Sequence, residues 1–171
     1  MESYKNTYDY KEEIIKKFKM HNPAIHTNNE KEYNWLNQDE ACVIEIKNTN
    51  GENLFIFLED EITISHGTWH DHYYYEDRYD YESAMTKVSN IINNLDCTLT
   101  IFSNGKCFGS GSELSKNKYT KKEVIEFIKN LFNGTEYEKF TKTFKKYGAN
   151  IKINYWDETK NYEIFLDKED F

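Results

Sequence analysis

The sequence contains few of the residues that mark several common classes of protein. Its 171 residues include one proline, seven glycines, three cysteines and a single arginine. The cysteines are odd in number and lack CxxC spacing, which argues against a disulfide framework and against a structural zinc site. The scarcity of proline and glycine, together with 16% aromatic residues, excludes a low-complexity or disordered chain. We therefore expect a globular protein whose cysteines are small buried side chains in a reducing compartment.

Long apolar runs are also missing. No apolar stretch approaches the roughly 18 residues of a membrane-spanning helix, and the N-terminus lacks the basic head and apolar run of a signal peptide. We expect a cytoplasmic protein without a membrane partner.

The chain carries more acid than base, because 30 acidic and 22 basic residues give a formal charge of -8. A net acid of this size repels phosphate backbones, so nucleic acid is not expected as a direct partner. The acid is concentrated in residues 71–82, where five carboxylates oppose Arg78 alone. This short segment therefore supplies half of the net charge.

Hydrophobic periodicity divides the chain into helices and strands. Apolar residues at helical spacing predict an N-terminal helix within residues 1–21, a helix over 81–95 and two helices within 120–147. Residues of alternating character predict a three-stranded meander over 41–66 and hairpins over 97–110 and 150–167. Asn-Gly turns support the first two, at 50–51 and 104–105, and the polar residues 157–160 join the runs of the last hairpin.

These elements indicate the fold class. A mass of 20.6 kDa suits one domain over residues 1–171. Short turns between successive strands favour antiparallel neighbours. We therefore expect a single α+β domain with a mostly antiparallel sheet of about five to seven strands, packed against three or four helices.

Three local patterns refine this prediction. Thr120 with Glu123, and Thr135 with Glu138, have the spacing of capping boxes at helix N-termini. The Gly109-Ser-Gly111 sequence has the glycine spacing of a phosphate loop, but no Lys-Ser/Thr pair follows and no helix begins there. Phosphate binding is therefore not favoured.

Residues 61–82 have the most unusual composition in the chain. The segment begins as a strand in which Ile62, Ile64 and His66 share one face, and this strand is expected to end at Gly67. Residues 68–82 then contain one tryptophan, two histidines, five tyrosines and five acidic residues before a helix is established. Tyr81 belongs to the apolar stripe of that helix and is expected to be buried.

A metal site is one interpretation of this segment. Imidazole is a common metal ligand, and three histidines with one open position form a familiar catalytic zinc arrangement. His66, His70 and His72 could supply it, since His70 and His72 point the same way in an extended segment. In this alternative the protein is a metal-dependent enzyme. The spacing fixes no fourth ligand, and His66 is also placed to face the core.

Acid-base catalysis is a second interpretation, in which His70 or His72 acts with Asp71, Glu76 or Asp77. Carboxylates and imidazoles so close in sequence cannot all converge on one reacting atom, and the chain has no GxSxG or Cys-His signature for a nucleophile. We expect no catalytic residues, no cofactor and no enzymatic activity.

A protein-binding surface is the third interpretation and the one we favour. Tyrosine and tryptophan supply large, stiff contact areas, and clustered carboxylates attract a basic partner. The expected partner-binding residues are Trp69, His70, Asp71, His72, Tyr73, Tyr74, Tyr75, Glu76, Asp77, Tyr79 and Asp80.

The same residues resemble a family of proteins. Ile62-Thr-Ile-Ser-His-Gly67, then Trp69-His70-Asp-His72-Tyr73, the helix over 84–95 and the hairpin over 98–109 are similar to small cytoplasmic immunity proteins of bacterial polymorphic-toxin systems of the contact-dependent inhibition type. The resemblance covers about a third to a half of the chain. It implies an antitoxin, monomeric or weakly dimeric, that binds a cognate toxin domain tightly and blocks its active site or substrate groove. A basic nuclease is the kind of toxin that fits the acidic charge.

Overall fold

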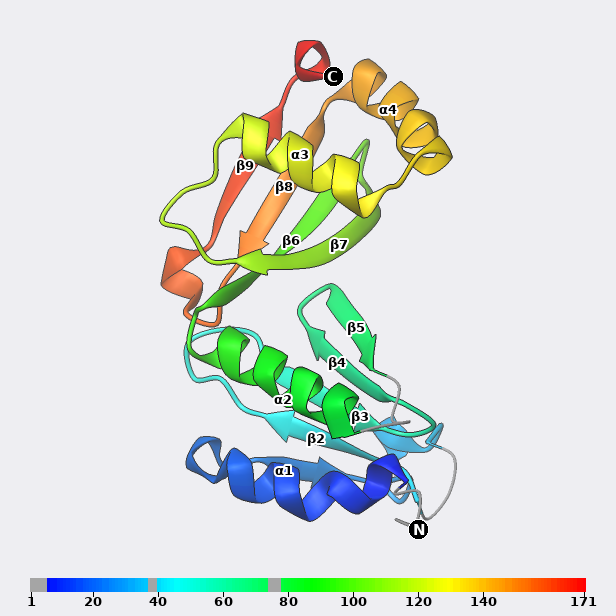
Figure 1. Ribbon diagram of the computed structural model, residues 1–171, viewed down its shortest axis with the longest axis vertical. Helices are drawn as coiled ribbons and strands as arrows, with labels where there is room; N and C mark the ends of the chain where they lie inside the picture. Colours follow the sequence, from blue (N-terminus) through cyan, green and yellow to red (C-terminus); the bar gives the residue numbers. More distant parts are fainter. Residues whose placement is uncertain (1–5, 37–39, 74–77) are drawn as a thin grey trace. The chain divides into compact units, whose positions relative to one another are not determined.

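The computed structural model describes residues 6–36, 40–73 and 78–171. Its elements form two compact units, residues 1–93 and 94–171, and each unit has its own antiparallel sheet (Figure 1). The predicted α+β class and the antiparallel pairing are confirmed. The strands are divided between a five-stranded and a four-stranded sheet.

The first unit is a five-stranded meander with two helices. The strands follow one another in the order β1-β2-β3-β4-β5. Its α-helices and strands are α1 (Lys11–Lys17), β1 (Ala24–His26), β2 (Cys42–Ile46), β3 (Leu54–Leu58), β4 (Ile62–His66), β5 (Trp69–Tyr73) and α2 (Arg78–Ile92). Short 3-10 turns lie at Thr7–Tyr10, Lys19–His21 and Lys31–Tyr33.

The predicted meander over 41–66 and the helix over 81–95 are confirmed as β2 to β4 and as α2. The N-terminal helix is shorter than predicted, because a 3-10 turn flanks α1 on each side. Strands β1 and β5 were not predicted. β5 is joined to β4 by a two-residue turn, Gly67-Thr68, in which Gly67 has a φ of 63°. Glycine adopts this backbone conformation at little cost, so the chain reverses where the strand was expected to end.

The two faces of this sheet differ. Alternate residues of β2, β3 and β4 are completely buried, and α1 and α2 cover the same face of the sheet in Figure 1. We call this the helix-covered face. The opposite face, which we call the open face, consists of two cross-strand rows: His26, Val43, Phe57, Thr63 and His72, then Ala24, Glu45, Phe55, Ser65 and His70.

The open face is covered on one side by the segment around Lys31–Tyr33. Leu36, Ala41 and Val43 form a small apolar cluster against which Tyr33 and the two phenylalanines of β3 pack. The remaining part of the face, towards β4 and β5, carries hydroxyl and imidazole side chains.

The second unit is a four-stranded sheet with two helices on one face (Figure 1). The strand order is β7-β6-β8-β9. The elements are β6 (Asp96–Ser103), β7 (Lys106–Leu114), α3 (Lys121–Leu131), α4 (Thr135–Tyr147), β8 (Ala149–Asn154) and β9 (Tyr162–Leu166). Two 3-10 turns, Glu158–Lys160 and Lys168–Asp170, complete it. The predicted hairpins and both predicted helices are present.

The two predicted capping boxes have different outcomes. At the start of α3 the Thr120 side chain accepts the Glu123 backbone N–H and the Glu123 carboxylate accepts the Thr120 N–H, as predicted. The prediction for Thr135 is wrong. The N-cap of α4 is Gly134, which has no side chain to accept a hydrogen bond.

The glycines of β7 are explained by packing. A Cβ atom on Gly109 would lie 2.9 Å from the Phe132 ring, and one on Gly111 would lie 2.9 Å from the Phe127 ring. Phe127 and Phe132 belong to the core of the second unit. The two glycines therefore let α3 approach the sheet closely.

This packing predicts that Gly111→Ala is destabilising. The added methyl group overlaps the Phe127 ring, and overpacking of this kind typically costs about 1–3 kcal/mol. Urea unfolding measures the loss. The matched control is Lys106→Ala, at an exposed position of the same strand, and it should change the free energy of unfolding by less than about 0.5 kcal/mol. Equal stability of the two variants would contradict this account.

Candidate functional site

The hairpin of β4 and β5 contains most of the described residues that the sequence analysis selected. Ser65 lies opposite His70, and Thr63 lies opposite His72. Since directly opposed residues share a face, His70 and His72 belong to the open face. β5 is the last strand of its sheet, and within the described part of the chain no strand pairs with its outer edge.

The predicted partner-binding residues differ in exposure. His70, Asp71 and His72 are exposed, Tyr73 and Asp80 are half-buried, and Tyr79 at the start of α2 is 74% exposed. Tyr74, Tyr75, Glu76 and Asp77 lie outside the described residues. Tyr81 is buried as predicted, stacked on Tyr10 with ring centroids 4.1 Å apart.

Trp69 requires a correction. We expected it in the exposed binding surface, but it is only 3% exposed. It pairs with His66 across the hairpin and therefore belongs to the helix-covered face. The continuation of the sheet beyond Gly67 is the physical reason, because strand pairing fixes the direction of each side chain.

His66 also lies apart from the other two histidines of the segment. It is 1% exposed and belongs to the helix-covered face, as its spacing with Ile62 and Ile64 predicts. Burial lowers its pKa to about 4, and a hydrogen bond with the Glu52 backbone acts in the opposite direction. His66, His70 and His72 therefore do not converge. Among the described residues, no group of three or more His, Cys, Asp or Glu side chains is arranged to hold a metal ion.

His72 is held by its neighbours on the open face. Its Nδ1 atom lies 2.5 Å from a carboxylate oxygen of Glu61 and 3.1 Å from the Thr63 hydroxyl. The His70 and His72 rings are 5.2 Å apart between centroids and almost perpendicular. The carboxylate that contacts His72 is thus that of Glu61, which the sequence analysis did not select.

Asp71 has a different role from the one expected in acid-base catalysis. Its carboxylate accepts the backbone N–H of His72 at 3.0 Å. It alternates with His70 and His72 along β5 and so lies on the other side of the strand. The arrangement pairs neither imidazole with Asp71.

Trp35 is an exposed aromatic residue that the sequence analysis missed. Its side chain is 52% exposed and its ring lies 6.1 Å from that of Phe57 on the open face. The signal was present, because β3 is apolar at every position and a tryptophan interrupts the polar loop that precedes β2.

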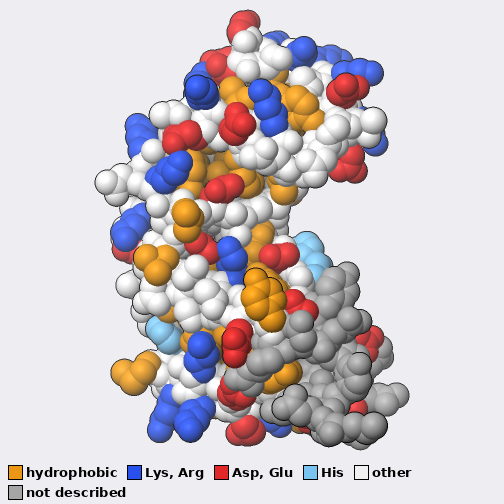
Figure 2. All heavy atoms as spheres, in the orientation of Figure 1, with side chains coloured by type: hydrophobic (Ala, Val, Ile, Leu, Met, Phe, Trp, Pro, Cys, Tyr) orange, Lys and Arg blue, Asp and Glu red, His pale blue; other side chains and the backbone are white. Residues whose placement is uncertain are grey.

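The acidic charge belongs to the first unit. Residues 1–93 contain 18 acidic and 9 basic residues, a formal charge of -9, whereas residues 94–171 contain 12 and 13, a formal charge of +1. Figure 2 shows basic and acidic side chains interspersed over the visible face of the second unit. A partner attracted by charge is therefore drawn to the unit that contains the β4–β5 hairpin.

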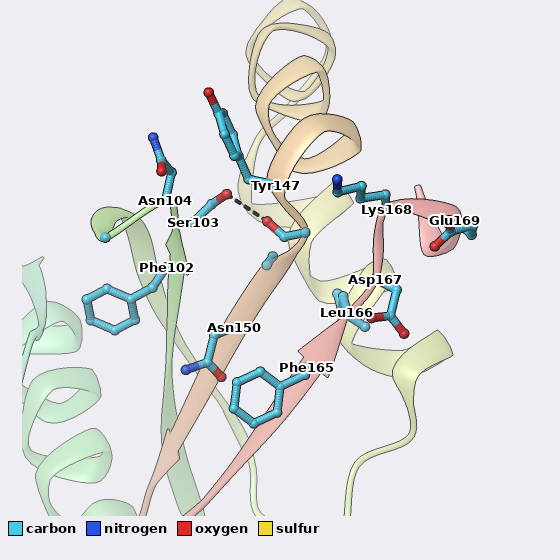
Figure 3. Close-up of a pocket in the computed structure, with 13 residues that line it drawn as sticks. Phe102, Ser103, Asn104, Tyr147, Asn150, Phe165, Leu166, Asp167, Lys168 and Glu169 are labelled. Carbon is cyan, nitrogen blue, oxygen red and sulfur yellow. Dashed lines mark hydrogen bonds between the residues drawn. The ribbon is translucent and has the colours of Figure 1, made fainter.

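The second unit has a cavity of about 630 Å³ at one end of its sheet. In Figure 3 its wall includes Tyr147, Asn150, Phe165 and the turn that begins at Asp167. Ser103 donates its hydroxyl hydrogen to the Gly148 carbonyl oxygen at 2.6 Å, so this hydroxyl is engaged in holding the backbone. Of the selected residues that the structure describes, none lines the cavity.

No family model, curated protein or solved structure matches the chain. The resemblance to immunity proteins stays a prediction from the residues given above. None of the helices in the described part of the chain is both long and apolar enough to cross a membrane.

Proposed function

We propose that this protein is an immunity protein that binds and neutralises a cognate bacterial toxin domain in the cytoplasm of the producing cell. Its binding surface consists of the exposed side chains of β5 and the start of α2. The observation that supports this most directly is the exposure of His70, Asp71, His72 and Tyr79 in the unit that carries the acidic charge.

The composition of this surface suits a basic protein partner. Carboxylates attract the partner over long range and raise the rate of association, and exposed aromatic rings supply the contact area that slows dissociation. A toxin that acts on nucleic acid must itself attract phosphate groups, so its active site is positively charged. Occupation of that site by the acidic unit excludes the substrate without any reaction in the immunity protein.

The direct test is co-expression with a toxin. We expect a reading frame for a long secreted protein with a variable C-terminal domain immediately upstream of the gene. Expression of that C-terminal domain alone should stop bacterial growth, and co-expression with this protein should restore it. The two should also elute as one complex in size-exclusion chromatography. A toxic domain that stays toxic and unbound in the presence of this protein would contradict the proposal.

Substitution of Tyr79 by alanine should weaken the complex. Its side chain is exposed in the free protein, and loss of an aromatic ring at the centre of an interface reduces affinity by roughly 10- to 100-fold. Calorimetric titration measures the dissociation constant. The control is Tyr147→Ala, a partly exposed tyrosine of the second unit, which should leave affinity unchanged. The melting temperature of both variants should stay close to that of the wild type.

Charge reversal tests the electrostatic part of the proposal. Asp71→Lys should slow association and reduce its dependence on salt, because the exposed carboxylate contributes to long-range attraction. Glu138→Lys makes the same change of net charge on α4 and should have little effect on the rate. Stopped-flow mixing with the toxin domain measures these rates, and equal slowing by Glu138→Lys would refute a localised surface. From the sequence alone, replacement of both Glu76 and Asp77 by lysine is expected to weaken toxin binding and to leave the melting temperature nearly unchanged.

A further inference from the structure

The β4–β5 hairpin brings two imidazoles together on an exposed surface. His70 and His72 are two residues apart on β5, so both side chains leave the strand on the open face. Their ring centroids are 5.2 Å apart and both residues are exposed. Two imidazoles at this spacing can bind one ion together, which gains the advantage of chelation over a single ligand.

The contacts of His72 select the form of the ring that binds metal ions. Its Nδ1 atom lies 2.5 Å from the Glu61 carboxylate. An ionised carboxylate accepts hydrogen bonds and cannot donate one. In the neutral ring the proton is therefore on Nδ1, and Nε2 carries the free lone pair. A carboxylate that accepts the other ring N–H is the usual companion of a metal-binding histidine, because it fixes the orientation of the ring and increases its basicity.

We propose that His70 and His72 bind one divalent transition-metal ion, and that Glu61 is the positioning residue that holds His72 for this purpose. Nitrogen ligands suit Zn²⁺, Ni²⁺ or Cu²⁺ and not Mg²⁺ or Ca²⁺, which prefer oxygen. His66 has no part in the site, because it lies on the helix-covered face. With two protein ligands, the ion keeps coordination positions that face solvent.

This site differs from the three-histidine site considered in the sequence analysis. It replaces His66 by a positioning carboxylate, and it involves no reaction. It is also independent of the proposed immunity function, since binding of an ion to His70 and His72 can be measured on the isolated protein.

Calorimetric titration of the metal-free full-length protein with ZnCl₂ tests the proposal. We expect one ion to bind per chain. His70→Gln and His72→Gln should each remove the chelate and weaken binding by at least about tenfold, while Glu61→Gln should weaken it by roughly 10- to 100-fold at unchanged stoichiometry. The control His21→Gln, at a histidine of the N-terminal 3-10 turn Lys19–His21, should bind as the wild type does.

NMR of the unsubstituted protein provides a second measurement that does not depend on variants. Zinc should shift the imidazole signals of His70 and His72 together, with the same midpoint, and leave those of His66 unchanged. Absence of binding, or binding that survives the double replacement of His70 and His72, would overturn the proposal. Glu138→Gln, a surface substitution on α4, is the control for Glu61→Gln. If both substitutions change the zinc affinity equally, Glu61 has no positioning role.

Discussion

Replacement of Gly148 by alanine is expected to lower the free energy of unfolding by about 3 kcal/mol or more. Gly148 ends α4 with a φ of 72° and a ψ of -175°, a region of backbone conformation open almost exclusively to glycine. A Cβ atom there would also lie 2.6 Å from the Leu166 carbonyl oxygen. That oxygen belongs to the backbone of β9, so it cannot move without disturbing the pairing of β8 and β9.

Thermal unfolding measures this effect, and a loss of 3 kcal/mol corresponds to a fall in melting temperature of roughly 6–12 °C for a chain of this size. Gly105→Asn is the matched control. Gly105 also has a φ of 72°, but no atom lies within 4 Å of a Cβ built there, and asparagine tolerates the left-handed region. If the two variants have the same melting temperature, the close approach of Gly148 to the Leu166 carbonyl oxygen does not make glycine necessary at position 148.

Acid is expected to destabilise the first unit through His66. The ordinary pKa of the side chain is 6.5, and burial lowers the pKa of His66 to about 4 in the folded protein. The unfolded chain therefore binds a proton more readily than the folded one between these values. The stabilising contribution of the neutral ring is complete above pH 6.5 and is lost as the pH falls from 6.5 to about 4. The free energy of unfolding falls by about 3 kcal/mol in total through this one group.

His66→Phe should remove this dependence, because phenylalanine keeps an aromatic ring against Trp69 and Leu54 and has no proton to gain. The quantity to measure is the difference in free energy of unfolding between this variant and the wild type, from urea titrations at several pH values. The difference should widen in favour of the variant as the pH falls from 6.5 to 4. Using a difference cancels the titration of groups present in both proteins, including His26, whose raised pKa acts in the opposite sense.

The exposed His70 provides the comparison. His70→Gln should retain the pH dependence of the wild type, because it leaves the buried imidazole in place. A constant difference between His66→Phe and the wild type across this pH range would show that protonation of His66 does not oppose folding.

The local order of elements could be predicted from the sequence because it depends on short-range preferences. Asn104-Gly105 occupies the turn between β6 and β7 with φ values of 48° and 72°, and the apolar stripe over 81–95 forms most of α2. Such signals come from the conformations that a few neighbouring residues allow. The errors have local causes too, since Gly134 occupies the N-cap position in place of Thr135.

The exposure of the residues selected from the sequence was predicted in part. The exposure of His70, Asp71, His72 and Tyr79 agrees with the composition of residues 61–82. The burial of Trp69 could not be foreseen, because it depends on the fifth strand of the sheet. This strand follows the Gly67-Thr68 turn, and its mostly polar residues lack the alternating pattern that predicts a strand. The contact of Glu61 with His72 follows from the same pairing, since Glu61 directly precedes β4 and His72 lies on β5.

The sequence by itself thus determined most of the helices and strands, with β1 and β5 as the exceptions, that neighbouring strands pair antiparallel, and where acidic and aromatic residues gather. The tertiary structure alone decided that the strands form two sheets, since β6 pairs with β8 through residues 48 to 56 positions apart in the sequence. It also decided which side of β5 each residue takes. Pairing between strands rotates every side chain to one face or the other, and a shift of one residue would exchange the buried and exposed sets. That choice depends on collective burial over the whole sheet, which no short stretch of sequence contains.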